Sequence, residues 1–244
     1  VSDDQTATVY AGLNVGYGNN DTDISMGDFI ATARTNGGLF FSDDDVTLQE
    51  DIAYAESELW MHWNSNSSVT IGDMDLVAVA SNKGVDGVGV LDSDSAIANA
   101  WLKFTDIEDS SLEIGASASE AAALAEDPLT MDALAINGGA LGNASAESWF
   151  KANDGSIADQ NDNATITLNQ DLIQTANALV GSGIAYAARD IAYAEADAVM
   201  EFDSNDGLDV TLQDVTLSAR AADTANAGFG FWENDATVAG SDSA

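Results

Sequence analysis

A phrase of strand-forming residues recurs five times along this chain of 244 residues. It reads VTIGDMDL from Val69, and its counterparts are ISMGDF from Ile24, LEIGAS from Leu112, ITLNQDL from Ile166 and VTLQDVTL from Val210. Successive copies begin 45, 43, 54 and 44 residues apart. A near-constant period of this length is typical of proteins built by stacking one structural unit on the next. The period therefore predicts a repeat architecture.

A literal repeat supports the same conclusion. The six residues DIAYAE occur at Asp51–Glu56 and again at Asp190–Glu195. An alignment that starts from this identity pairs Met61 with Met200 and needs a two-residue insertion near Leu208. The predicted repeat units are residues 6–50, 51–95, 96–141, 142–189 and 190–235 of a single domain, followed by a polar tail at 236–244.

Each unit has the residue pattern of about three short strands. Small or polar residues alternate with large apolar ones, and Asn, Asp, Gly and Ser separate the alternating phrases. Ser117–Asp127 is the best helix candidate, but it stands where other units have an AxAxA strand. Alanine at alternate positions suits a slender core between two close sheets. We predict an all-β fold, a β-solenoid of about five degenerate repeats, with a β-sandwich or jelly roll as the alternative.

The full repeat also resembles a known family. Its cycle is a Gly-rich apolar phrase, an AxAxA phrase, an Asn/Asp/Ser/Gly turn and a phrase such as VTIGDMDL followed by AxA, from about Thr6 to Trp232. This cycle resembles the repeats of large secreted bacterial surface proteins, the filamentous-haemagglutinin-like adhesins. The resemblance implies a right-handed β-helix in an extracellular protein.

The charge of the chain excludes several partners. Lys and Arg total 6 against 42 Asp and Glu, a formal net charge of −36. Such a field repels nucleic acid and anionic lipid, and it favours high salt or bound divalent cations. The chain has no cysteine. It also contains no apolar run of about 18 residues, the pattern that would predict membrane insertion. Because it begins with Val1 rather than Met, we expect a processed, exported chain, with an artificially trimmed chain as the alternative.

Two groups of acidic residues are candidate Ca²⁺ ligands. Carboxylates recur in four of the five copies of the central phrase, at Asp28, Asp73, Asp171 and Asp214, with Ala116 near that place in the third copy. Stacked copies would form a ladder of like charges, and a bound hard cation would relieve their repulsion. Aspartates that cap turns and face water explain the pattern more simply.

The second group lies in the phrase DSNDGLD, which offers Asp203, Asn205 and Asp209 to an ion. The phrase lacks the full spacing of a calcium loop. A hairpin turn through Asp206 and Gly207 is the simpler explanation.

No catalytic motif is present, and we predict that the chain is not an enzyme. His62 is the only histidine, which excludes a zinc site built on several histidines within the chain. Tryptophan recurs in the units and could line a sugar-binding face, but a stacked core or a subunit contact is the favoured explanation. The tryptophans are Trp60, Trp63, Trp101, Trp149 and Trp232. Four Asn-x-Ser/Thr sequons occur, at Asn20, Asn66, Asn143 and Asn163.

These observations predict a structural role. A stack of coils has open strand edges at its ends, and neither terminal sequence contains an obvious cap. The leading hypothesis is an extracellular homopolymer, a filament or surface layer joined through β edges, with Ca²⁺ or other divalent cations as possible partners. The alternatives are a monomeric adhesin or carbohydrate-binding module and, third, a polysaccharide-degrading solenoid enzyme.

Overall fold

The computed structural model describes residues 6–16, 19–37, 52–82, 95–115, 128–137, 143–153, 161–180, 193–203, 205–223 and 233–240. The regular structure of these residues is entirely β-strand, arranged in three sheets. Sheet A contains β1 (Thr6–Val15), β5 (Ile52–Ser65), β8 (Ser95–Glu108), β11 (Asn143–Ala152) and β14 (Tyr193–Phe202), with the short β2 (Asn19–Asn20) beside β5.

Sheets B and C complete each coil. Sheet B contains β3 (Asp23–Met26), β6 (Ser68–Ile71), β9 (Ser111–Ile114), β12 (Thr165–Leu168) and β15 (Asp209–Thr211). Sheet C contains β4 (Phe29–Gly37), β7 (Met74–Asn82), β10 (Leu129–Asn137), β13 (Leu172–Val180), β16 (Val215–Asp223) and β17 (Glu233–Gly240).

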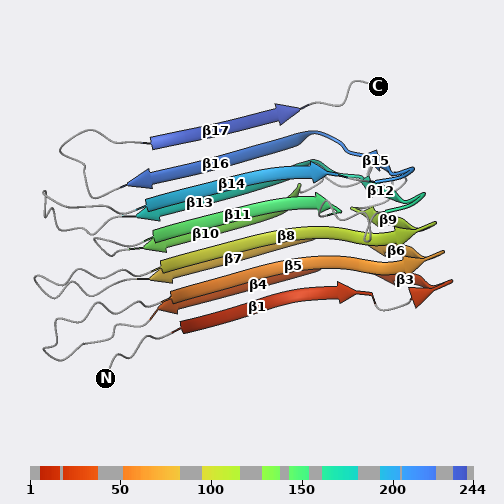
Figure 1. Ribbon diagram of the computed structural model, residues 1–244, viewed down its shortest axis with the longest axis horizontal. Helices are drawn as coiled ribbons and strands as arrows, with labels where there is room; N and C mark the ends of the chain where they lie inside the picture. The colour runs from red at the N-terminus through yellow and green to blue at the C-terminus, as the bar shows by residue number, and fades with distance from the viewer. Residues whose placement is uncertain are drawn as a thin grey trace, which may run out of the picture.

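The chain passes from sheet A through sheet B to sheet C and then starts the next coil. Every pairing between successive coils is parallel. Figure 1 shows the five coils stacked along one axis, with the long strands of sheets A and C packed face to face and the short strands of sheet B at one end. The fold is a β-solenoid, as predicted, and not a sandwich of antiparallel hairpins.

The central phrase defines the register correctly. Ile24, Val69, Leu112, Ile166 and Val210, which begin the five copies, are successive partners in sheet B. Their side chains enter the core, since Val69, Leu112 and Ile166 are buried.

The DIAYAE identity, in contrast, is out of register by two residues. In sheet A, the register partners of Ile52 on the following coils are Ser95, Asn143 and Tyr193. The DIAYAE identity instead pairs Ile52 with Ile191. The predicted match of Met61 with Met200 is therefore wrong, and no insertion near Leu208 is needed. A slip of two residues keeps every side chain on the same face of the sheet.

Alanine lets sheets A and C approach closely. Ala53 and Ala55 on β5, and Ala78 and Ala80 on β7, are fully buried between the two sheets. The gap is narrow enough for the Ser57 hydroxyl to donate a 2.8 Å hydrogen bond to a carbonyl of sheet C. The prediction of a slender, small-residue core is confirmed. Larger apolar residues fill the core toward sheet B, where Leu59, Met61, Phe104 and Phe150 are buried.

The third coil corrects the placing of its AxAxA strand. That strand is β10, in register with both β7 and β13, and it follows Pro128 rather than lying at Ser117–Asp127. The helix candidate itself, Ala116 and the greater part of the Gly-rich phrases lie outside the described residues.

The C-terminal end of sheet C also differs from expectation. β17 pairs antiparallel with β16, from Val215 with Gly240 to Ala222 with Glu233. Figure 1 shows β17 as the outermost strand of the stack. This segment was expected to leave the strand pattern for a polar tail, and instead it covers one of the three sheet edges at this end.

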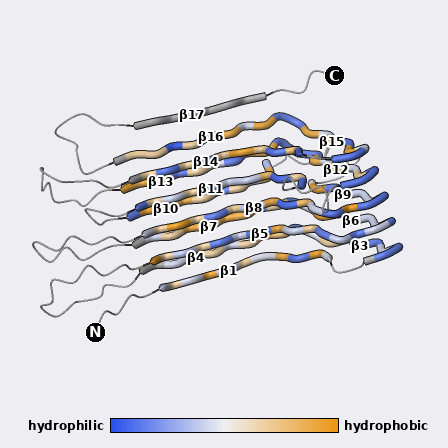
Figure 2. Tube along the Cα trace, in the orientation of Figure 1, coloured by the Kyte–Doolittle hydropathy of each residue, from blue (hydrophilic) through white to orange (hydrophobic). Residues whose placement is uncertain are grey.

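A column of left-handed residues turns the chain from sheet A to sheet B. Its members, one per coil, have positive φ angles and are Asp21 (φ 55°), Asn66 (47°), Asp109 (46°), Asn163 (48°) and Gly207 (68°). Asn, Asp and Gly are the residues that adopt this conformation at low cost. The turn at Asp206 and Gly207 is therefore a corner between two sheets and not the predicted hairpin. Figure 2 shows that this corner is hydrophilic.

The left-handed column gives a direct stability prediction. Replacing Asn163 with valine is expected to lower the free energy of unfolding by about 1–2 kcal/mol, because a β-branched side chain is strained at positive φ. Replacing Asn163 with glycine, the residue of the fifth coil, should change it by only a few tenths of a kcal/mol. Urea unfolding followed by circular dichroism measures both, and equal stabilities of the two variants would contradict the assignment.

Candidate functional site

The outward side chains of sheet A form a regular grid of aromatic and charged residues. Because the strands are in register, each outward residue has a neighbour on the next coil about 4.8 Å away. The grid contains Tyr10 on β1; Tyr54, Glu56, Glu58, Trp60 and His62 on β5; Asn99, Trp101 and Lys103 on β8; Glu147, Trp149 and Lys151 on β11; and Glu195, Asp197, Val199 and Glu201 on β14.

Glu58 is the centre of an ion-paired cluster on this face. Its side chain is only 7% exposed, and Lys103 Nζ lies 2.8 Å from its Oε1 atom. The Tyr10 hydroxyl donates a 3.0 Å hydrogen bond to its Oε2 atom. Burial, followed by the negative charge of Glu58, raises the pKa of Tyr10 to about 12. The ring of Tyr10 lies over Gly12, where a Cβ atom would come within 2.5 Å of the tyrosine hydroxyl.

The tryptophans occupy the outer face and not the core. Trp60, Trp101 and Trp149 are partly buried there, and Trp63 is 47% exposed. The expectation of a stacked core is wrong for Trp60, Trp101 and Trp149, and Trp63 also lies outside the core. Trp232 lies outside the described residues.

Only two of the tryptophans share a column. Trp101 and Trp149 are register partners, and Val199 continues their column. Trp60 lies two residues further along, opposite Lys103. Lys103 Nζ lies 3.4 Å from the ring centroid of Trp101, and Lys151 Nζ lies 5.2 Å from that of Trp149. Each lysine thus contributes a cation–π contact to the column.

Three carboxylates crowd the grid near its fifth coil. Glu147 and Asp197 are register partners, and Glu195 is two residues before Asp197 on the same strand. Burial raises the pKa of Glu147, and the charges of Asp197 and Glu195 raise it further, while Lys103 opposes the shift. Burial and then Glu195 likewise raise the pKa of Asp197. The ionised carboxylates therefore lie in a region of unfavourable negative charge.

His62 is buried in a structural position at the end of this face. Its ring stacks on Trp60 with centroids 4.2 Å apart, and Nε2 lies 2.7 Å from Asn14 Oδ1. Burial lowers the pKa of His62, opposed by the charges of Asp106 and Glu58. The mid-strand position of His62 between Met61 and Trp63 predicts an exposed side chain, but the side chain is only 2% exposed.

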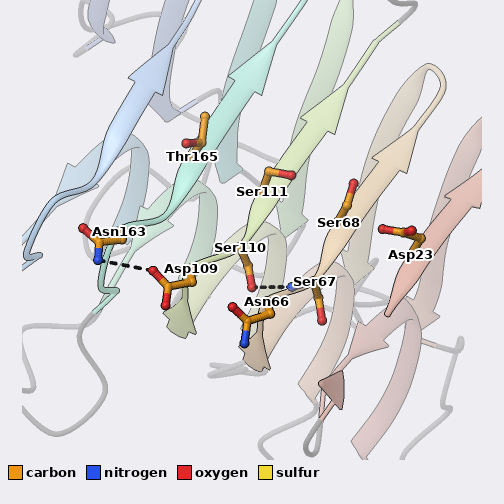
Figure 3. Close-up of a pocket in the computed structure, with 9 residues that line it drawn as sticks. All are labelled: Asp23, Asn66, Ser67, Ser68, Asp109, Ser110, Ser111, Asn163 and Thr165. Carbon is orange, nitrogen blue, oxygen red and sulfur yellow. Dashed lines mark hydrogen bonds between the residues drawn. The ribbon is translucent and has the colours of Figure 1, made fainter. Parts of the chain in front are cut away.

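A groove follows the corner between sheets A and B. This corner groove has a volume of about 390 Å³ and is lined by Asp23, Asn66, Ser67, Ser68, Asp109, Ser110, Ser111, Asn163 and Thr165. Figure 3 shows these side chains along successive coils, with Asn163 bonded to Asp109 and Ser110 bonded to the backbone of Ser67. The hydroxyls of the buried serines form hydrogen bonds with backbone groups, so the groove is a turn lined by hydroxyl groups. The sequon residues Asn66 and Asn163 are exposed at its rim.

The predicted aspartate ladder exists as two separate pairs. Asp28 lies beside Asp73 and Asp171 beside Asp214, and all four are exposed. In each pair a carboxylate oxygen accepts the backbone N–H of the next coil's aspartate at 3.3 Å. Gln170 donates to Asp73 at 2.7 Å and so connects the two pairs past the third coil. These contacts are the turn-capping arrangement.

The residues of the DSNDGLD phrase are spread over a corner. Asp203 follows β14, and Asp209 begins β15. Asn205 donates to the carbonyl of Ala152 at 3.2 Å and accepts a 2.8 Å hydrogen bond from the buried Asn161. Among the described residues no group of three or more His, Asp or Glu side chains is arranged to hold a metal ion. Ca²⁺ binding remains a prediction.

Sequence reasoning missed the Glu58 cluster and the buried Asn99. Both depend on which residues of neighbouring coils are adjacent. The central phrase is the signal that could have found them. If its register is extended into sheet A, Glu58 lies opposite Trp101, and Lys103 is two residues further along the same strand as Trp101.

The chain matches no protein-family model, no curated protein and no solved structure. Nor does any described segment form a helix of the length and apolar character that a membrane crossing requires.

Proposed function

We propose that this protein is a structural β-solenoid of an extracellular filament or surface layer, in which copies join by adding β1 of one copy to β14 of the next. The observation that carries the proposal is the edge of β1. This strand pairs with β5 on one side, and no described strand pairs with its other side.

The β1 edge lacks the features that normally prevent strand addition. Native edge strands are usually protected by charged residues, proline, bulges or short length. β1 is 10 residues long, reads TATVYAGLNV, and contains no charged residue and no proline, in a chain of net charge −36. Its inward residues, such as Val9 and Leu13, pack against the core.

The opposite edge of sheet A is complementary in pattern. β14 reads YAEADAVMEF, and three of its outward residues are acidic. If β1 of a second copy occupies the position of a sixth coil, the uncharged Thr8 and Tyr10 face Glu195 and Asp197. Small and apolar inward residues of both strands then continue the core. Pairing β14 with another β14 would instead oppose like charges, which is unfavourable.

β17 is the obstacle to this junction. It occupies the edge of sheet C beside β16, so β4 of a second copy can join that sheet only if β17 leaves or is included as an antiparallel strand. We therefore propose that β17 limits assembly.

The test compares charge variants of one exposed residue on β1. Thr8→Glu places a carboxylate opposite Glu195 and should keep the protein monomeric, whereas Thr8→Lys, of similar size, should assemble at least as well as wild type. A chain ending at residue 223 should assemble more readily than the full chain. Light scattering after size exclusion, and negative-stain images with and without a chelator, measure assembly. Monomers for wild type, Thr8→Lys and the shortened chain under all conditions would refute the proposal, as would equal assembly of Thr8→Glu and Thr8→Lys.

A further inference from the structure

The outer face of sheet A carries carboxylates that have no cationic partner among the described residues. Lys103 pairs with Glu58, and Lys151 pairs with Glu201 at 3.4 Å. Within the described parts of the chain no cation forms an ion pair with Glu147, Asp197 or Glu195. The local charge therefore favours a cationic ligand, which is a separate property from the proposed assembly.

A buried amide beside these carboxylates also lacks a partner. Asn99 is only 5% exposed and is the register partner of Glu147. Its Nδ2 atom donates to the Tyr54 hydroxyl at 3.1 Å, but its Oδ1 atom has no hydrogen-bond donor among the described residues. Leaving a buried acceptor unsatisfied is costly, and a ligand that supplies a donor there removes that cost.

The adjacent column adds a surface that suits a ring. Trp149 lies beside Glu147 on β11, and its buried indole N–H has no partner in the described structure. An indole with a free donor next to carboxylates can pack against one face of a ring while hydrogen bonding to its substituents. The column runs across the strands, and its two tryptophans, Trp101 and Trp149, lie on successive coils about 4.8 Å apart along the solenoid axis.

We propose that Asn99, Glu147, Asp197 and Trp149 bind an amino-sugar chain, a polymer of glucosamine type, lying along the solenoid axis. Its ammonium groups pair with Glu147 and Asp197, a ring packs on Trp149, and a hydroxyl or ammonium group donates to Asn99. An extended sugar chain advances by nearly one coil spacing per residue, so successive rings meet successive coils. A neutral glycan satisfies the amide but leaves the carboxylates uncompensated.

Calorimetric titration with three matched oligosaccharides tests the ligand class. The glucosamine hexamer should bind, its N-acetylated form and a neutral glucose hexamer should bind at least tenfold more weakly, and added salt should weaken binding of the glucosamine hexamer. Spermine, a flexible cation without rings, should also bind at least tenfold more weakly. No binding of the glucosamine hexamer, or equal binding of spermine or of a neutral chain, would overturn the proposal.

Charge-removing variants test the site. Glu147→Gln and Asp197→Asn should each weaken binding of the glucosamine hexamer about tenfold, whereas Asp209→Asn, which removes an exposed carboxylate from sheet B, should leave binding unchanged. Equal losses in all three variants would indicate attraction by net charge alone and would contradict a specific site. The titrations use concentrations at which the protein is monomeric, so failure of binding and failure of assembly are observed separately.

Stability distinguishes binding from a structural role. Because burial and like charge raise the pKa of Glu147, the folded protein holds this proton more tightly than the unfolded chain does, and the ionised carboxylate lowers stability at neutral pH. The facing charged groups are Asp197 and Glu195 on β14 and Lys103 on β8. Glu147→Gln should therefore raise the melting temperature at pH 7, and the difference should disappear near pH 4, around the pKa of an unfolded glutamate. A lower melting temperature of this variant at pH 7 would assign Glu147 to the fold instead.

Discussion

Replacing Phe150 with alanine is expected to lower the free energy of unfolding by about 3–5 kcal/mol, the usual cost of emptying a phenylalanine site in a core. Phe150 is completely buried, and its ring meets those of Phe104 and Phe202 edge to face, with centroids 5.7 and 5.2 Å apart. It therefore connects three coils through one cluster of aromatic rings. The cavity cannot be filled from the alanine-rich side of the core without moving a sheet.

Phe202 provides the matched control for this substitution. It belongs to the same cluster of aromatic rings but lies on the terminal coil and is 43% exposed. Phe202→Ala should therefore cost less than half as much as Phe150→Ala. Urea unfolding followed by both circular dichroism and tryptophan fluorescence measures the difference, and coincident transitions test whether the coils unfold together. Equal losses in the two variants would contradict the described core.

The central repeated phrase was sufficient to predict the solenoid because its inward positions are apolar in every coil. Ile24 and its four partners keep the same phase in all five coils. The turn residues were also readable, since the left-handed corner needs Asn, Asp or Gly. Both signals are local and therefore visible in a sequence.

The register of sheet A was not readable from the same evidence. A strand with a two-residue period looks the same after a slip of two, so the DIAYAE identity was convincing and still misplaced. The alignment on DIAYAE pairs Trp60 with Val199 and so places Trp60 in the column of Trp101, which conceals the ion pair of Glu58 with Lys103. β17 was missed for a different reason. It runs antiparallel and outside the repeat, so no other coil provides a copy of it.

The second large effect concerns Glu58 and Lys103. Lys103→Met is expected to lower the free energy of unfolding by about 3 kcal/mol, because it leaves the carboxylate of Glu58 buried without a cation. The value is at the lower end for such changes because the lysine side chain is 25% exposed and water reaches it. Methionine retains most of the aliphatic contact with Trp101, so the loss reports the charge rather than the packing.

The double variant Glu58→Gln with Lys103→Met separates charge from shape. Glutamine keeps an oxygen for the Tyr10 hydroxyl, and no buried charge is left, so most of the lost stability should return.

The pKa of Tyr10 provides an independent readout. Because Glu58 helps to raise it to about 12, spectroscopic titration should find it lower in Glu58→Gln and in the double variant, but not in Lys103→Met, where the uncompensated carboxylate remains. If the double variant were as unstable as Lys103→Met alone, the ion pair would not be the source of the lost stability. Packing of the lysine side chain on Trp101 would then have to explain that loss.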